Sequence, residues 1–203
     1  MSQCYRSRMP LVRPKDVREK LDPFFIGGNL LFDFCNTEVG AGERRVDLIP
    51  DPKSLSRFVF LSLGLSTTIS PTDFKQLRKW RQVLRGFFSD PVRGFSALND
   101  QLSVGVKSVS IALIGGNRFE FTPILKSEAP LQKAIISELV RFLSIADRSR
   151  MKKCANPDCT HLFYDQTKNA GRTWCTMASC GNLMKARAFQ KRRRAKKLKI
   201  KTG

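Results

Sequence analysis

The chain has 203 residues, of which 37 are Lys or Arg and 17 are Asp or Glu, so its formal net charge is +20. With 41% hydrophobic residues it can bury a core, which excludes a wholly disordered protein. No apolar run reaches the roughly 18–20 residues of a membrane-spanning helix, and no apolar segment follows the basic N-terminus. We therefore expect no membrane partner, no secretory signal and a cytoplasmic location.

The positive charge is concentrated at one end of the chain. Residues 148–203 carry 16 bases and two acids, a balance of +14, whereas residues 1–147 carry 21 bases and 15 acids. From Met184 onward there are ten bases and no acid. Because a concentrated cationic segment attracts polyanions, this distribution predicts nucleic acid as the partner.

The first apolar block follows a polar, basic stretch over residues 1–22, which we expect to be a loose arm or a peripheral strand. The block covers residues 29–37, and its length and the capping residue Asn29 favour a short helix over a strand. Its polar members have two interpretations, because a buried polar group must be hydrogen-bonded. They either cap neighbouring backbone or face a small-molecule effector. These residues are Asp33, Asn36 and Thr37.

Three further helices are indicated by their start signals. Asp51-Pro52 and Ser70-Pro71 each combine an N-cap with proline at the first helical position, and the second of these helices should end near Asp90. We also expect a short helical segment over residues 96–104. Pro130 opens another helix, whose expected buried side consists of Leu131, Ala134, Ile135, Leu139, Phe142, Leu143 and Ala146.

Between these helices, residues 109–113 alternate apolar and small polar side chains before a Gly115-Gly116-Asn117 turn, which predicts a β-hairpin. The predicted fold class is therefore α+β: a predominantly α-helical N-terminal domain with a small hairpin, then a Cys4 zinc finger and a basic C-terminal helix. We expect three parts, namely the arm at 1–22, the helical domain at 23–149 and the finger with its tail at 150–203.

The zinc finger is predicted from four of the six cysteines, which lie within 27 residues at x4, x15 and x4 spacings: Cys154, Cys159, Cys175 and Cys180. Zn²⁺ takes four thiolates in tetrahedral geometry, and two short-spaced pairs can supply them. Four protein ligands leave no open coordination position, so the metal should be one structural Zn²⁺. Buried or disulfide-paired cysteines are the alternative, as is replacement of one ligand by His161.

Beyond the last cysteine, residues 183–199 contain no Gly or Pro, which predicts a helix capped by Asn182. Leu183, Ala186 and Phe189 are expected to pack against the zinc module, leaving the bases to contact phosphates. A merely solubilising tail is the alternative. The predicted nucleic-acid-binding residues are Asn182, Lys185, Arg187, Lys191, Arg192, Arg193, Arg194, Lys196 and Lys197.

The stretches Lys153–Cys159, Arg172–Cys175 and Cys180-Gly181-Asn182 resemble the bacterial CGNR zinc finger family. In that family an ABATE domain precedes the finger, and residues 27–37 look like its opening motif. The resemblance implies a stress-induced transcription regulator, the four cysteines as zinc ligands, and the finger as the DNA-binding part. This sequence departs from the family at Leu183, where the family has arginine.

Enzyme chemistry has little support in this sequence. The single histidine adjoins the finger, so no Ser/His/Asp set can form in the N-terminal domain, and there is no phosphate-binding glycine loop. We therefore expect a non-enzymatic, zinc-dependent, nucleoid-associated regulator that prefers DNA to RNA. Its N-terminal domain would sense a small-molecule effector or form a homodimer. The alternatives are an RNA- or ribosome-associated protein and a zinc-stabilised protein-interaction module.

Overall fold

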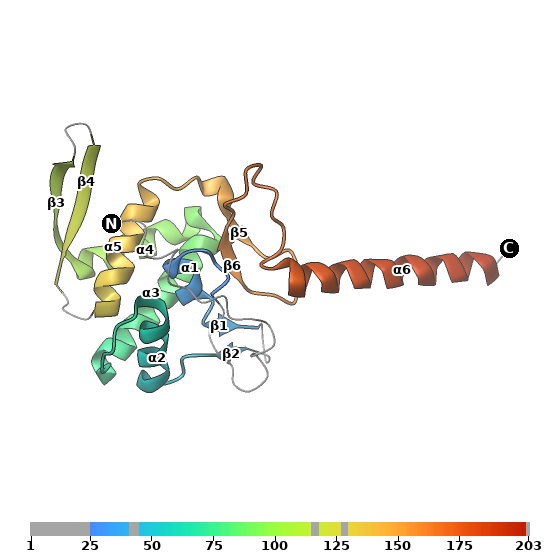
Figure 1. The fold of residues 1–203 in the computed structure, drawn as a ribbon, viewed down its shortest axis with the longest axis horizontal. Helices are drawn as coiled ribbons and strands as arrows, with labels where there is room; N and C mark the ends of the chain where they lie inside the picture. The colour runs from blue at the N-terminus through green and yellow to red at the C-terminus, as the bar shows by residue number, and fades with distance from the viewer. Residues whose placement is uncertain (1–24, 41–44, 115–117, 127–129, 202–203) are drawn as a thin grey trace.

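The computed structural model describes residues 25–40, 45–114, 118–126 and 130–201. This part of the chain is α+β and predominantly helical, with two-stranded antiparallel sheets and a long C-terminal helix that projects from the body (Figure 1). The predicted arm at residues 1–22 lies outside the described residues. No helix among them combines the length and the apolar character needed to cross a bilayer.

The short helix α1 (Leu30–Cys35) lies at the centre of the core. All six of its residues are buried, including Asp33 at 2% exposure. The Asn29 side chain caps it by accepting a hydrogen bond from the Leu31 N–H at 2.8 Å. The preference for a helix over a strand in this block is therefore confirmed.

The next two helices, α2 (Pro52–Leu63) and α3 (Pro71–Ser89), begin where the sequence predicts. The Asp51 carboxylate accepts from the Ser54 N–H at 2.8 Å, and the Ser70 hydroxyl accepts from the Asp73 N–H at 3.0 Å. These caps act within one turn of chain, so they are readable without knowledge of the tertiary structure.

Helix α4 (Pro91–Gly105) is longer than the predicted segment at 96–104. The Asp90 N–H donates to Gly86 O in the last turn of α3, while its carboxylate accepts from the Val92 and Arg93 N–H groups. Pro91 is therefore the first residue of a new helix as well as the stop of the old one. The sequence predicts the end of α3 near Asp90 but not the start of α4 at Pro91.

The hairpin is confirmed as β3 (Val106–Ile114) paired antiparallel with β4 (Arg118–Leu125), and its turn at 115–117 lies outside the described residues. Helix α5 (Pro130–Leu143) follows, with Leu131 and Leu139 among its buried residues. One member of its predicted buried side needs correction, because Leu143, at the last turn of the helix, is 37% exposed. Ala146 lies beyond the end of the helix but still packs, partly buried, against the main core.

A buried arginine joins α3 to the short strands β1 (Glu38–Val39) and β2 (Val46–Asp47). Arg81 is 1% exposed, and its guanidinium donates to both Asp47 carboxylate oxygens, at 2.7 and 2.6 Å. It also donates to the Thr37 hydroxyl at 3.0 Å and lies 3.7 Å from the Glu38 carboxylate. This network fixes the β1–β2 pair against the helical core.

The last strands, β5 (Met151–Lys153) and β6 (Leu162–Tyr164), connect the cysteine-rich segment to that core. Leu162 belongs to the main hydrophobic cluster. The Asn36 amide donates to Leu162 O at 2.8 Å and accepts from the Leu162 N–H at 2.9 Å. Residues on the two sides of the predicted 149/150 boundary therefore share one core, while the three-part division itself stays a prediction.

We predict that Arg81→Ala lowers the free energy of unfolding by about 3 kcal/mol, because it leaves the carboxylates of Glu38 and Asp47 without their buried partner. Urea denaturation followed by circular dichroism measures the loss. As a control, Arg93→Ala removes an arginine that is 90% exposed and should change stability by less than about 0.5 kcal/mol. Equal effects of the two substitutions would contradict the structural role of Arg81.

Candidate metal centre

The four clustered cysteines converge on a single point. Cys154 follows β5, Cys159 precedes β6, and Cys175 and Cys180 come from the loop and turn that lead to the last helix. Their Sγ atoms all lie within 4.8 Å of one another, with 3.8 Å between Cys159 and Cys175 and 3.6 Å between Cys175 and Cys180. Tetrahedral zinc with Zn–S bonds of about 2.3 Å requires sulfurs about 3.8 Å apart, so the arrangement fits Zn²⁺.

The sulfurs are buried and accept hydrogen bonds from a backbone N–H and from a side-chain amide. All four cysteines are 9% exposed or less and none forms a disulfide. The Cys175 N–H donates to the Cys154 sulfur at 3.4 Å, and the Asn156 amide donates to the Cys180 sulfur at 3.3 Å. Donors aimed at sulfur stabilise the thiolate, which is the form that binds metal.

The pKa values of two neighbouring cysteines of the cluster shift in opposite directions. A hydrogen bond from the Cys175 thiol, aided by His161, lowers the pKa of Cys159 to about 3. The same bond raises the pKa of Cys175 above its ordinary value, as do burial and the charge on Cys159. One thiolate therefore opposes ionisation of the next, and a divalent cation is what allows all four to ionise together.

His161 lies beside the sulfur cluster rather than in it. Its Nδ1 is 3.1 Å from the Cys159 sulfur, and only the four cysteine sulfurs converge among the metal-ligating atoms of the described residues. The structure therefore supports the Cys4 set over the alternative in which His161 replaces a ligand.

A buried carboxylate, which the sequence analysis did not single out, orders the loop between the two cysteine pairs. Asp165 is 0% exposed and accepts from Lys152 Nζ at 2.8 Å and from the Arg172 N–H at 2.7 Å. Burial raises the pKa of Asp165, but these hydrogen bonds and those from Thr167 outweigh burial and hold it below its usual range. The ionised carboxylate thus anchors both ends of the loop.

Arg172 ties this loop to the N-terminal half of the chain. Its guanidinium lies 4.2 Å from the centroid of the Phe163 ring and donates to the carbonyls of Trp174 and Cys175. It also donates to Ile26 O at 3.1 Å. Arg172, three residues before Cys175, is therefore held by the segment that leads into α1.

The last helix, α6 (Asn182–Lys201), continues directly from a π-helical turn, η4 (Met177–Gly181). The cap is Thr176, whose hydroxyl accepts from the Ser179 N–H at 3.2 Å, whereas Asn182 already has helical backbone angles. The prediction of Asn182 as the cap is therefore wrong. The helical conformation begins one turn earlier, at Met177, so Cys180 contributes its sulfur to the cluster from within this first turn.

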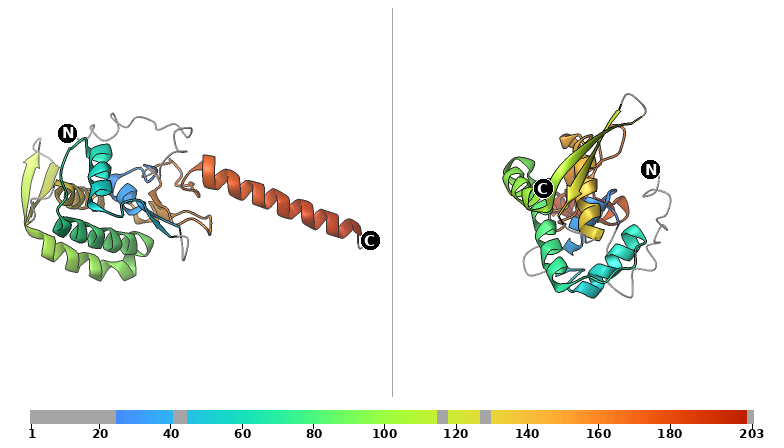
Figure 2. Two further views of the ribbon diagram at one scale, coloured as in Figure 1. Left: turned by 90° about the horizontal axis from the view of Figure 1, so that it is seen from below. Right: turned by 90° about the vertical axis from the view of Figure 1, so that its left-hand side faces the viewer.

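The expected packing of Leu183, Ala186 and Phe189 against the finger is also wrong. Leu183 is 44% and Phe189 54% exposed, and Ala186 is exposed as well. The physical reason is visible in Figures 1 and 2, where α6 leads straight away from the body and only its first turns adjoin other elements. A projecting helix has no core face.

This projection leaves the predicted nucleic-acid-binding side chains on one exposed helix. Arg187 donates to the Asp158 carboxylate at 2.7 Å, and this ion pair holds the second turn of α6 to the finger. Asn182 is exposed, and the side chains of Lys196 and Lys197 lie outside the described part of α6. The other predicted members, all exposed, are Lys185, Lys191, Arg192, Arg193 and Arg194.

The three polar residues of the first apolar block are all partnered within the protein. Asp33 accepts from the Gly27 N–H at 2.7 Å, and Asn36 makes its two bonds to Leu162. The Thr37 hydroxyl donates to Phe34 O at 2.7 Å and accepts from Arg81. These contacts favour the capping interpretation over an effector pocket formed by these residues.

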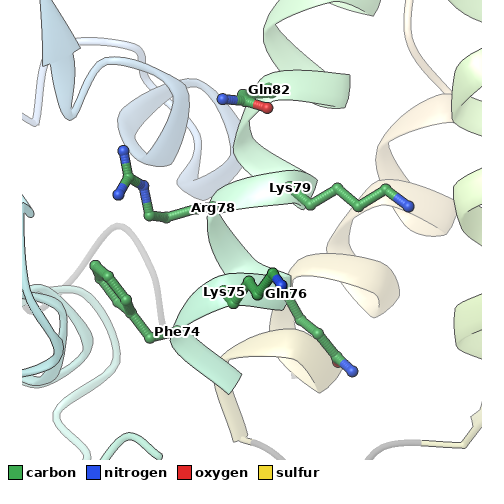
Figure 3. Close-up of a pocket in the computed structure, with 6 residues that line it drawn as sticks. All are labelled: Phe74, Lys75, Gln76, Arg78, Lys79 and Gln82. Atoms are coloured by element: carbon green, nitrogen blue, oxygen red, sulfur yellow. The ribbon is translucent and has the colours of Figure 1, made fainter. Parts of the chain in front are cut away.

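A shallow depression lies instead on the outer face of α3 (Figure 3). All of its lining residues come from this one helix, and their side chains spread apart rather than converge. It is therefore an open basic surface and not an enclosed site. The lining residues are Phe74, Lys75, Gln76, Arg78, Lys79 and Gln82.

Comparison with known proteins identifies the cysteine-rich segment. Residues 150–193 match the CGNR zinc finger family. The matched segment covers about a fifth of the chain and contains all four converging cysteines. A search of curated proteins with the chain gave no match. Together with the sulfur geometry, the family match identifies a zinc finger that holds one structural Zn²⁺.

We predict that Cys175→Ser abolishes stoichiometric zinc binding, because a hydroxyl replaces the sulfur that contacts two other ligands. Elemental analysis of the purified protein should give about one zinc per chain for wild type and far less for the variant. Since metal binding supplies folding free energy, hydrogen exchange should also accelerate across residues 154–181.

The matched control is Cys35→Ala, which removes a buried free cysteine of α1 outside the cluster. This variant should keep its zinc. Retention of a full equivalent of zinc by Cys175→Ser would contradict the proposed ligand set.

Proposed function

We propose that this protein is a zinc-dependent DNA-binding regulator of transcription, in which the finger fixes the direction of α6 and α6 contacts DNA. The observation that carries the proposal is the long, exposed, projecting helix with ten bases and no acid, rooted at the metal site by Cys180 in η4. No fold requirement explains such a helix, because its described side chains bury little surface.

The charge on the described part of α6 is largely uncompensated by the other described residues. Among the described residues, Arg187 has an acidic partner in Asp158, whereas no carboxylate lies within 4.0 Å of Lys185 or of Lys191–Arg194. Arg187 and Lys191 are i,i+4 neighbours of like charge, which destabilises an isolated helix. Phosphates relieve this repulsion and release counterions, so a polyanion both stabilises the helix and binds to it.

For residues 23–149 we propose a sensing or dimerisation role. The resemblance of residues 27–37 to the opening motif of an ABATE domain supports it, since that domain precedes the finger in the CGNR family. The hydrogen bonds from Asn36 to Leu162 and from Arg172 to Ile26 give this half of the chain a direct mechanical connection to the finger. The resemblance to the CGNR family also leads us to propose that the protein acts at the nucleoid in the response to stress. Because the sequence offers no catalytic motif, we propose that it is not an enzyme.

The proposal predicts a steep salt dependence carried by α6. Replacing Arg192, Arg193 and Arg194 by Ala keeps helix propensity while removing three bases, and should lower the slope of log K against log[salt] by up to about 2.7, or 0.9 for each lost phosphate contact. Fluorescence anisotropy with a labelled duplex at several salt concentrations gives the slope.

A control with the same change of charge is available on the body of the protein. Lys75, Lys79 and Arg93 are exposed bases of α3 and α4, and their joint replacement by Ala should leave the slope nearly unchanged. Equal effects of the two triple variants would favour non-specific attraction. Tighter binding to structured RNA than to duplex DNA at equal salt would favour the RNA-associated alternative.

Regulation is tested by recovering bound DNA from cells that express the chain or its Cys175→Ser variant. Enrichment of discrete promoter sites by the wild type, lost in the variant, is the expected result. Uniform recovery of the genome by both proteins would overturn the assignment as a regulator, because it would reflect the charge of α6 alone.

A further inference from the structure

One ion pair shows which side of α6 faces the finger. Successive residues of an α-helix are rotated by about 100°, and Arg187 is held against Asp158 of the finger. Phe189 follows Arg187 by two residues, so it projects from nearly the opposite side, away from Asp158. It is 54% exposed, the one aromatic side chain in a helix otherwise rich in bases.

The surroundings of Phe189 distinguish it from an ordinary exposed apolar residue. Lys185 precedes it by four residues, and Arg192 and Arg193 follow by three and four, so all three share its side of the helix. The Arg193 guanidinium lies 5.8 Å from the centroid of the Phe189 ring. The outward face of α6 therefore has an apolar centre ringed by cations, which we term the Phe189 face.

The dimensions of α6 limit which nucleic-acid groove can receive this face. An α-helix with side chains is about 10–12 Å across, close to the roughly 12 Å width of the B-DNA major groove and about twice that of the minor groove. The major groove of A-form RNA is too narrow for side chains to read. An apolar group in the DNA major groove meets one apolar feature on the base edges, the C5-methyl group of thymine.

We propose that α6 enters the major groove of B-form DNA with the Phe189 face toward the bases, and that Phe189 packs against thymine methyl groups. Lys185, Arg192 and Arg193 then lie beside the phosphates that border the groove, while the Arg187–Asp158 pair keeps the finger outside it. The inference rests on the proposed function and adds to it a residue that determines sequence preference.

The test removes only the C5-methyl group of thymine from the DNA and leaves the protein unchanged. Binding of the full-length zinc-loaded protein is measured on an alternating A·T duplex and on the same duplex with deoxyuridine in place of thymidine. Wild type should bind the uridine duplex about fourfold more weakly for each methyl contacted, the factor that corresponds to burial of one methyl-sized group. Phe189→Ala should weaken binding to the thymidine duplex and bind both duplexes equally.

Leu183→Ala is the matched control. Leu183 is also exposed on α6 but precedes Arg187 by four residues, so it lies on the side that faces the finger. This variant should keep the wild-type preference for thymidine. Circular dichroism and zinc content establish that each variant is folded and loaded.

Three results would overturn the inference. Equal wild-type affinity for the two duplexes would remove thymine contact while leaving DNA binding intact. A Phe189-dependent preference for single-stranded over duplex DNA would assign the ring to stacking on unpaired bases. No binding to any nucleic acid would overturn the proposed function itself, so the two failures are distinguishable.

Discussion

The mutual repulsion of four neighbouring thiolates is the constraint on which the C-terminal half depends. Sulfurs within 4.8 Å of one another do not ionise together without a cation, and the raised pKa of Cys175 beside the lowered pKa of Cys159 reflects that conflict. Zn²⁺ resolves it and in doing so fixes the turn that contains Cys180. Since α6 continues from this turn with no break, the metal also determines where the helix points.

The finger depends on the rest of the chain as well as on its metal. β6 contributes Leu162 to the main core, and the bonds between Asn36 and Leu162 join residues more than 120 positions apart. Arg172 reaches Ile26 from the other side. The segments on either side of α1 are therefore joined to the finger at two points.

The two halves use polar side chains in opposite ways. In the body, Asp33, Thr37 and Arg81 are buried, and each forms hydrogen bonds with backbone or side-chain groups of the protein. These side chains therefore stabilise the fold. On α6 the bases whose side chains the structure describes, Lys185 to Arg194, remain exposed, and among them Arg187 has an acidic partner in Asp158. Residues that stabilise the structure and residues available to a partner are thus separated along the sequence, as the asymmetry of charge indicates.

The sequence by itself determined the features that arise from local chemistry: the starts of α2 and α3 through Asp51 and Ser70, the hairpin, the α+β class and the four zinc ligands. Caps and short ligand spacings act within a few residues, so no knowledge of the fold is needed. The Asp90-Pro91 junction and the Thr176 cap are equally local, so the sequence contains their signals as well. Only the tertiary structure decided that Asp165, bound by Lys152 and by the Arg172 N–H, orders the finger. It also exposed Phe189, because a helical pattern gives the spacing of side chains but not which side the rest of the chain will cover.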